Sequence, residues 1–553
     1  MISELEDALN GPSNLIYLCC VNRGILDDAL TLALETGDAA SARLLETIAA
    51  SVSLSPTSPS CWPLAHFEEV AVWPMDVESL LVSPDSGGEA AARSLLEQAV
   101  SPEKWQRHGE CAAGPHCPFC TSRDQLSKES SREALIRILR WHEISTSRRW
   151  SFRDLFSLTS YLLAGHRNTE SGDNTDPCEW AAVQLGLDGE LSQLSKPSKT
   201  KSVALFELLA ASYEHALFGE WRHTNRAQFR QDIRDLSMET NHTLMGLFYF
   251  LQSRRSTAHY PATIAASLES MSHLDPALAD PDGDIPVSSK SNLTIRDIDI
   301  AFSQSVEAGF DLVRKYQFLN ATEAMVLRRL GDLDKALSGS ATRRKKPAAA
   351  LRVQATIRDF ACRVVRRSLG AKSAVVPNES ILRAYQQIGD EKEGQGRLLY
   401  DAARRVEELL NTGDAFEVSL TTTFGQPIPP EQRRATLVLP RRAVRMTPQE
   451  LNGRPKSPIR FLRVGSGSSE QSIALTYDLF KAVIELDRGL SRASLPKTVV
   501  AMLDAAKARL SGPLVRDAEL LERARMRLGD SRASIMAYRD TFVARAEDRS
   551  SGY

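Results

Sequence analysis

Residues 14–30, with the sequence NLIYLCCVNRGILDDAL, constrain the fold of this chain more than any other stretch. Residues 15–21 form an uninterrupted apolar run of β-forming residues, and the apolar positions after Gly24 recur at helical spacing. This pattern predicts a strand buried on both faces, a tight turn and a helix. Such strands belong to open parallel sheets, whose carboxyl ends hold ligands, so we expect Asn22 and Arg23 at the mouth of a site.

Length and charge limit the classes of protein that this chain can represent. Its 553 residues exceed what one hydrophobic core can hold, so we expect about two to four domains. The formal net charge of −2 excludes a uniformly basic coat for nucleic acid but allows local basic patches. No apolar run reaches the roughly 20 residues of a membrane span, and the first twelve residues do not have the pattern of a secretory signal. We therefore expect a cytoplasmic protein with no membrane partner.

Periodicity predicts an α/β segment followed by a helical one. Residues 1–85 read as half of an α/β core, in which residues 67–73 (FEEVAVW) supply a second strand. Residues 86–273 have helical spacing almost throughout. Within them we expect a helix over 152–164, because Ser151 is a good N-cap at its start.

A linker and a third segment complete the predicted organisation. Residues 274–292 (LDPALADPDGDIPVSSKSN) have the Pro, Asp, Gly and Ser content of a linker. Residues 293–553 are expected to form a helical domain that contains a small antiparallel sheet. Period-two patterns place its strands at 416–420, 436–439 and 459–464, and helical patterns close the chain at 476–486, 495–510 and 515–545. The predicted fold class is mixed α/β and predominantly helical.

Four residues with metal-ligand spacing lie close together in the helical segment. The set is His108, Cys111, Cys117 and Cys120. Three thiolates and one imidazole satisfy tetrahedral Zn²⁺, and with no open position the ion would be structural. His116 and Cys178 are rival fourth ligands. The alternative is a set of ordinary thiols on a loop.

Basic residues gather in two places and offer contacts for DNA phosphates. The first group is helical, contains Asp359 as its only acid, and includes Arg343, Arg344, Lys345, Lys346, Arg363, Arg366 and Arg367. The second group surrounds the predicted small sheet and comprises Arg433, Arg434, Arg441, Arg442, Arg445, Lys456, Arg460 and Arg463. A solvated helix face and a charged sheet edge are equally good explanations of the two groups.

The order of elements in the first 165 residues resembles the second half of a P-loop ATPase of the AAA+ or STAND type. The resemblance rests on a strand that ends at Asn22, a second strand followed by WPMDVESLL, and a helix that opens SFRDLFSL. It implies that Asn22 orients the attacking water and that Arg153, or Arg149 in its place, reaches the phosphates of ATP and Mg²⁺ beside Arg23. The alternative is that Asn22 lies in an ordinary strand-to-helix turn and that Arg153 is a solvated first-turn residue.

The phosphate-binding loop of that family is not in the sequence. No G-x-x-x-x-G-K-[ST] motif and no strand ending in Asp-Glu precede residue 14. The resemblance implies that both lie ahead of residue 1. The chain would then be the carboxyl-terminal part of an ATPase, and it would hydrolyse ATP only when an upstream segment completes it.

Short motifs along most of the chain resemble the DptF-type ATPases of phosphorothioation-dependent DNA restriction and related phage-defence ATPases. These motifs are VNRGIL, WPMDVESL, CPFC, RWSFRDLFSL, LDP, FGQP and LTYDLFKAV. The resemblance implies an ATPase-associated part of a bacterial DNA restriction complex, with DNA and other defence subunits as partners. The rival hypothesis is a non-enzymatic, zinc-containing DNA-binding or scaffold protein.

Overall fold

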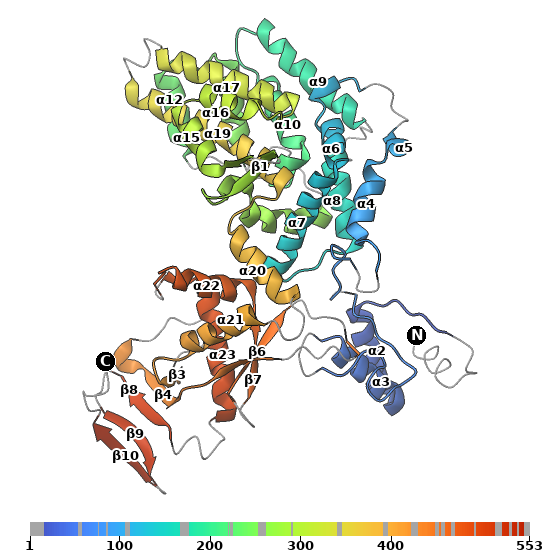
Figure 1. The fold of residues 1–553 in the computed structure, drawn as a ribbon, viewed down its shortest axis with the longest axis vertical. Helices are drawn as coiled ribbons and strands as arrows, with labels where there is room; N and C mark the ends of the chain where they lie inside the picture. The colour runs from blue at the N-terminus through green and yellow to red at the C-terminus, as the bar shows by residue number, and fades with distance from the viewer. Residues whose placement is uncertain are drawn as a thin grey trace. The chain divides into compact units, whose positions relative to one another are not determined.

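The computed structural model describes residues 16–546 with internal gaps. The gaps are residues 54–57, 76, 84–86, 106–110, 166–175, 219–220, 222–224, 253–261, 289–290, 340–345, 391–395, 422–429, 448–452, 455–458, 466–469, 492–493, 515–522, 530–532 and 539–540. The chain divides into two compact units. We call Ser79–Ser380 the helical unit, and Met1–Glu78 together with Ile381–Tyr553 the sheet unit. The mixed α/β, predominantly helical class predicted from the sequence is confirmed (Figure 1).

The helical unit is built from helices and one two-stranded ribbon. Its elements are α4 (Ala91–Val100), α5 (Pro102–Trp105), η2 (Gly114–His116), α6 (Pro118–Leu126), α7 (Glu129–Thr146), α8 (Phe152–Ala164), α9 (Pro177–Gly189), η4 (Glu190–Gln193), α10 (Lys199–Ala211), α11 (Tyr213–Ala216), α12 (Arg226–Asp235), α13 (His242–Gln252), α14 (Ala262–Ser270), η5 (Met271–Leu274), η6 (Pro276–Leu278), β1 (Asp284–Ser288), β2 (Ser291–Thr294), α15 (Ile295–Gln304), α16 (Val306–Arg314), α17 (Ala321–Gly339) and α19 (Pro347–Ser373). The helix predicted over 152–164 is confirmed as α8, with Ser151 as its N-cap.

Helix α19 is the central element of the helical unit. Its 27 residues span about 40 Å, and its apolar positions recur at the spacing of one helix face. Val353, Ile357, Phe360 and Val364 are buried in the main core cluster. Helices α7, α12, α15 and α17 all pack against α19. A helix that other helices cover on several sides must satisfy its polar side chains through partners on those neighbours.

The linker predicted over residues 274–292 is wrong. In the structure this segment forms η6, β1 and part of β2, and it belongs to the core of the helical unit. Leu274 and Ile285 are fully buried, and the Asp275 carboxylate pairs with the buried Arg367. The polar composition that indicated a linker instead provides tight turns and a buried counter-ion, so no domain boundary lies here.

The sheet unit contains two antiparallel sheets and several helices. Its elements are α2 (Arg23–Thr36), α3 (Ala39–Ser51), α20 (Glu379–Asp390), α21 (Arg397–Leu410), β3 (Ala415–Ser419), η7 (Glu431–Arg433), β4 (Ala435–Pro440), β5 (Val444–Met446), β6 (Arg460–Val464), β7 (Gln471–Leu475), α22 (Tyr477–Asp487), α23 (Lys497–Leu514), β8 (Arg525–Leu528), β9 (Ala533–Tyr538) and β10 (Thr541–Ala546). The sheet orders are β10-β9-β8-β4-β3 and β5-β6-β7. The strands predicted near 416, 436 and 459 are confirmed as β3, β4 and β6, and all three pair antiparallel. The single small sheet predicted from them is wrong, because β6 belongs to a different sheet from β3 and β4.

The strand predicted over residues 15–21 does not form in the described residues 16–21. These residues have no regular secondary structure, and no described strand pairs with them. Ile16 is 97% exposed and Leu18 is 87% exposed. An apolar strand needs hydrogen-bonded neighbours, and none is present among the described residues. The strand predicted over 67–73 is also wrong, because that segment closes a series of turns in which the amide of Val72 donates to the carbonyl of Cys61.

The helix predicted over residues 515–545 is wrong as well. The described part of this range forms β8, β9 and β10, which extend the sheet beyond β4. Alanine, arginine and methionine dominate the segment and favour helices. Antiparallel pairing with β4 nevertheless decides the structure, because tertiary context overrides propensity.

The first segment of the sheet unit is held to its second segment by hydrogen bonds to backbone carbonyls. Arg454 donates to the carbonyl of Ser53 over 2.7 Å and to that of Ser58 over 2.9 Å. The amide of Trp62 donates to the carbonyl of Gly453 over 3.0 Å. Residues near 60 and near 453 therefore form one structure although some 390 positions separate them.

Among the described helices, none is long and apolar enough to cross a membrane.

Candidate metal centre

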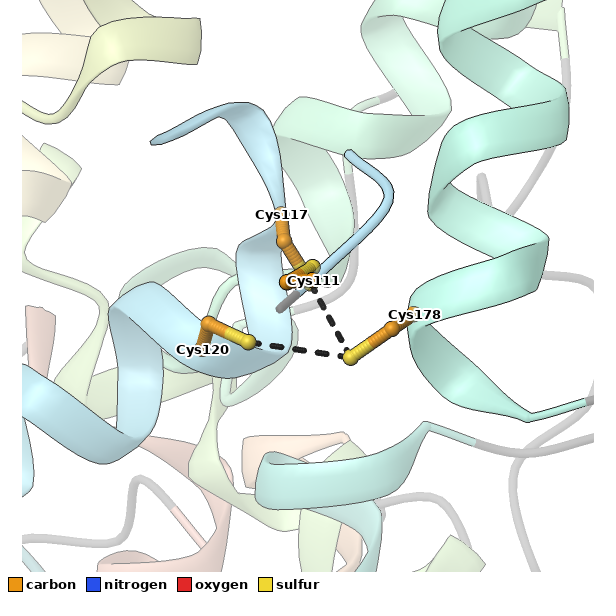
Figure 2. Close-up of side chains that lie close together, drawn as sticks. All are labelled: Cys111, Cys117, Cys120 and Cys178. Carbon is orange, nitrogen blue, oxygen red and sulfur yellow. Dashed lines mark hydrogen bonds between the residues drawn. The ribbon is translucent and has the colours of Figure 1, made fainter. Parts of the chain in front are cut away.

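Four cysteines converge in the helical unit. The sulfur atoms of Cys111, Cys117, Cys120 and Cys178 all lie within 4.8 Å of one another. Figure 2 shows Cys178 facing the other three from the start of a separate helix. Cys117 is fully buried and the other three are half-buried. No other group of three or more metal-binding side chains occurs among the residues that the structure describes.

Local sequence explains how these cysteines are positioned. Cys117 is the N-cap of α6, and Pro118 occupies the first helical position, where a missing N–H carries no penalty. Cys120 follows Cys117 by three positions, about one helical turn, so the two cysteines lie on the same side of the helix. A turn through Gly114, at φ +55°, brings Cys111 back toward this helix end, because the amide of Gly114 donates to the carbonyl of Cys111 over 2.9 Å.

Cys178 comes from the start of helix α9, which Asp176 caps. The amide of Cys178 donates to the Asp176 carboxylate over 2.7 Å. Helices α6 and α9 thus present cysteines at their amino-terminal ends, where the positive end of the helix dipole stabilises thiolates. Phe119 and Trp180, with ring centroids 5.8 Å apart, pack beside the sulfur atoms and join the same two helices.

The sulfur separations match those of ligands around one tetrahedral ion. Zinc–sulfur bonds of about 2.3 Å at tetrahedral angles place the sulfur atoms about 3.8 Å apart. Two of the separations are 3.8 Å, between Cys117 and Cys178, and 3.6 Å, between Cys120 and Cys178, and all of them are within 4.8 Å. An iron–sulfur cluster also takes four thiolates, but it distributes them over several iron atoms and so needs a wider set. The donor chemistry and the geometry therefore both fit a single Zn²⁺.

The electrostatics of the cluster favour a bound cation. A hydrogen bond from Cys117 is the main cause that lowers the pKa of Cys120 to about 6, and the Arg123 guanidinium contributes in the same direction. The reciprocal hydrogen bond raises the pKa of Cys117, and burial raises that of Cys178. Without a cation only part of the set ionises, because neighbouring thiolates repel one another. A divalent ion would remove that repulsion and deprotonate its ligands.

The sequence named three of these ligands, and the structure changes the fourth. His108 lies outside the described residues. His116 belongs to η2, and its side chain is not part of the cysteine cluster. Cys178, the rival fourth ligand in the sequence, joins the cluster although some 60 residues separate it from Cys117 and Cys120. A metal able to take these four cysteines is thus supported by the structure.

Asn22 and Arg23 lie at the start of α2 and have local partners. The Asn22 side chain caps the helix by accepting from the amide of Ile25 over 2.9 Å. Arg23 donates to the carbonyl of Val52 over 3.0 Å and so joins the start of α2 to the end of α3. These contacts are what the turn interpretation of Asn22 predicts.

Arg149 and Arg153 lie in the helical unit, whereas Asn22 and Arg23 belong to the sheet unit. The two arginine side chains differ in their surroundings. Arg149 donates to the buried Glu143 over 3.1 Å, in a network that also includes Arg140 and Ser79. Arg153 is exposed in the first turn of α8. Arg149 therefore has a structural role, whereas the Arg153 side chain lies in solvent.

The basic residues near α19 are largely used inside the fold. Residues Arg343, Arg344 and Lys345 lie outside the described part of the chain, Lys346 is exposed, and Arg363 is half-buried. Arg366 donates to the carbonyls of Ala277 and Ala279, and Arg367 forms a buried ion pair with Asp275. For Arg366 and Arg367 the prediction of DNA contact is wrong, because these guanidinium groups bind the protein itself.

A buried charge cluster was not predicted from the sequence. Lys372 lies 3.1 Å from the carboxylate of Glu214 and 3.8 Å from that of Glu323, and His215 lies 3.0 Å from Glu323. All four side chains are nearly or fully buried. The residues come from α11, α17 and α19, so no local spacing reveals the cluster, which we call the lysine cluster.

Comparisons with known proteins give no relative for this chain. No family model matches it, and neither the curated proteins nor the solved structures provide a match.

Proposed function

We propose that this chain is a zinc-containing binding or scaffold protein in which Cys111, Cys117, Cys120 and Cys178 hold one Zn²⁺. The sulfur separations of 3.6 and 3.8 Å carry the proposal. Four thiolates leave no coordination position for water or substrate, so the ion has a structural role. It joins the start of α6 to the start of α9, and DNA is the partner that we propose for the protein.

The metal content of purified protein tests this proposal. We expect one zinc per chain in the wild type, measured by elemental analysis. Cys178→Ser should lose the zinc and lower the melting temperature, because it removes one ligand of four. Cys362→Ser is the matched control, since that cysteine lies on α19 outside the cluster, and it should retain the zinc.

Two results would contradict the zinc centre. Visible absorption from an iron–sulfur cluster would mean that the thiolates hold a different group. Equal zinc content in Cys178→Ser and the wild type would mean that the ion is bound elsewhere.

A second candidate function is an ATPase-associated subunit that a phosphate-loop segment completes. The exposed apolar residues between positions 16 and 34 of this chain favour this role. Ile16 and Leu18 are almost fully exposed, and Ile25, Leu32 and Leu34 of α2 are each about half exposed. Several large apolar residues exposed within one short stretch of chain are a candidate interaction site. In this proposal residues 16–21 bind the sheet of an upstream ATPase segment within a DNA-defence complex.

ATP turnover tests the second candidate. We expect hydrolysis only when the chain is mixed with the polypeptide encoded immediately upstream, and loss of that hydrolysis in Arg153→Ala. For Asn22 the sharper variant is Asn22→Ser, because serine preserves the cap of α2 but removes the amide that would orient water. Absence of turnover in the mixture would exclude this role.

A further inference from the structure

The sheet formed by β3, β4, β8, β9 and β10 has one face that carries arginines. In antiparallel pairs, residues directly opposite each other point to the same face. Arg527 of β8 lies opposite Thr436 of β4 and Ser534 of β9, and Ser534 lies opposite Arg545 of β10. Arg525 points to the same side as Arg527, because the two are separated by one residue of the strand. We call this surface the arginine face.

The other face of this sheet is the one that packs inward. Phe416 and Val418 of β3 and Leu437 and Leu439 of β4 are all buried, and each is paired with a member of the same set. They alternate along their strands with the residues that share the side of Arg525 and Arg527. The arginine face is therefore the side opposite the apolar core, and Arg525 and Arg545 on it are exposed.

Positive charge accumulates on this part of a chain that is nearly neutral overall. Residues 523–546 contain six arginines against two aspartates, whereas the whole chain has a net charge of −2. Arg527 pairs with Glu417 over 3.3 Å. Arg525 and Arg545 have no ion pair with another described residue. Arg433, which is also exposed, lies just before β4, where the amide of Gly529 donates to the carbonyl of Arg434.

Protection of a sheet edge does not explain this arrangement. Charged side chains on edge strands prevent pairing with other chains, and this accounts for Arg545 on β10. It does not account for Arg525 and Arg527, because β8 is an interior strand with β4 on one side and β9 on the other. Glu417 compensates the charge of Arg527. The charges of Arg525 and Arg545 therefore remain for an external anion to compensate.

We propose that the arginine face binds the phosphate backbone of double-stranded DNA. The inference rests on the DNA-binding role proposed above and assigns it a surface. Guanidinium groups bind phosphates through two parallel hydrogen bonds. Arg525 lies opposite Met536, and Met536 lies opposite Val543. Strands about 4.8 Å apart and a rise of about 3.4 Å per residue therefore place Arg525 and Arg545 about 12 Å apart, which is close to the major-groove width of about 12 Å. The two arginines can thus face phosphates on opposite sides of one groove.

Binding of a labelled mixed-sequence duplex to the full chain, followed by fluorescence anisotropy between about 50 and 200 mM salt, tests this surface. The test variant combines Arg525→Gln and Arg545→Gln. The matched control combines Arg314→Gln and Arg404→Gln, which removes two exposed arginines from α16 and α21. Circular dichroism of both variants should match that of the wild type, which would show that the substitutions leave the fold intact.

We expect the test variant to bind the duplex about ten- to a hundredfold more weakly, and its slope of log K against log salt to fall by about two. The control should bind like the wild type. Equal weakening in the control would overturn the proposal, because only net charge would then matter. Unchanged binding in the test variant would overturn the surface and leave the DNA role standing.

Failure of the DNA role gives a different result. If the wild type does not bind the duplex at the lowest salt concentration, both the role and the surface are wrong. Competition completes the test, with single-stranded RNA and polyglutamate at equal charge concentration. If the RNA or the polyglutamate displaces the duplex from the wild type, and does so less well from the variant without Arg525 and Arg545, the surface binds that polyanion and the proposal of DNA is wrong.

Discussion

Lys372 is a buried positive charge that is stabilised by partners within the helical unit. Its ammonium group donates to the carbonyl of Phe318 and to the hydroxyl of Ser368, both over 2.7 Å, and it lies between the carboxylates of Glu214 and Glu323. Burial alone would lower the pKa of Lys372, but these two carboxylates raise it above its ordinary value. Lys372 is therefore charged in the folded protein, and both carboxylates depend on it.

Removing the positive charge of the lysine cluster should destabilise the helical unit strongly. Lys372→Met leaves two carboxylates buried without their cation, and we expect the free energy of unfolding to fall by about 3–5 kcal/mol. Urea denaturation measures the change. Lys335→Met is the control, because that side chain is 76% exposed and lies 3.9 Å from Glu307; its effect should stay within about 0.5 kcal/mol. A comparable effect of the two variants would contradict the role of Lys372.

Glu323 should make the stability of the protein depend on pH. Burial by itself raises the pKa of this carboxyl, but the Lys372 charge and the hydrogen bond with His215 outweigh it and lower the pKa to about 2. An unfolded glutamate has a pKa of about 4.3, so the unfolded chain binds a proton first. The stabilisation is therefore complete above about pH 5 and is lost as the pH falls toward 2.

Denaturation curves at a series of pH values measure this dependence. Glu323→Gln should be less stable than the wild type at neutral pH, and its free energy of unfolding should change less between pH 5 and pH 3. An unchanged dependence on pH would mean that other carboxyls cause the acid sensitivity.

Single residues also show the limit of prediction from sequence. The spacing of Cys111, Cys117 and Cys120 identified most of the metal cluster, because these ligands are neighbours in the chain. Arg366 and Arg367 were misjudged for the opposite reason. Their partners lie near residues 275–279, some 90 positions away, so a count of local acids could not find them.

At the scale of elements, helices α10 and α13 make an unusually close contact. Gly246 of α13 faces the backbone of α10, and a β-carbon at this position would collide with the carbonyl of Ser202 and with the ring of Phe206. Because backbone cannot move aside as a side chain can, only glycine fits here. The packing of this helix pair therefore depends on one small residue.

Gly246→Ala should destabilise the helical unit by about 1–3 kcal/mol through overpacking. Gly186→Ala in α9 is the control. Its β-carbon would meet no atom within 4 Å, and alanine gains up to about 1 kcal/mol of helix propensity over glycine. The two variants should thus shift the melting temperature in opposite directions. A shift in the same direction would contradict the close contact of α10 with α13.

Elements with strong local signals were predicted well, and elements defined by distant pairing were not. The N-cap Ser151 and the apolar spacing after it located α8. Strands β8 to β10 were missed because their Ala, Arg and Met residues favour a helix in isolation. The apolar run at 15–21 gave a strand signal, but the described residues provide no neighbouring strand for it.

At the scale of the whole molecule, one unit is inserted in the other. The helical unit is continuous from Ser79 to Ser380, whereas the sheet unit is assembled from the chain before it and the chain after it. The sequence did not predict this, since composition placed the boundary at 274–292, inside the helical core. Leu274 and Ile285 are buried, so this segment is part of the core and not a linker between domains.

The helical unit should fold when it is produced alone. It contains the four cysteines, the lysine cluster and all of α19. We expect residues 79–380 to give a cooperative unfolding transition and to bind one zinc per chain, measured by circular dichroism and elemental analysis. A fragment that is helical but unfolds without cooperativity would show that the sheet unit is needed for its packing.

The insertion also determines the order in which the protein can form during synthesis. Ribosomes add about 5–20 residues per second, so the 302 residues from Ser79 to Ser380 take about 15 to 60 seconds to produce. Throughout this interval the segment before Ser79 has emerged, but Gly453 and Arg454, which hold it in the finished protein, do not yet exist. The helical unit therefore has time to fold before the sheet unit can close.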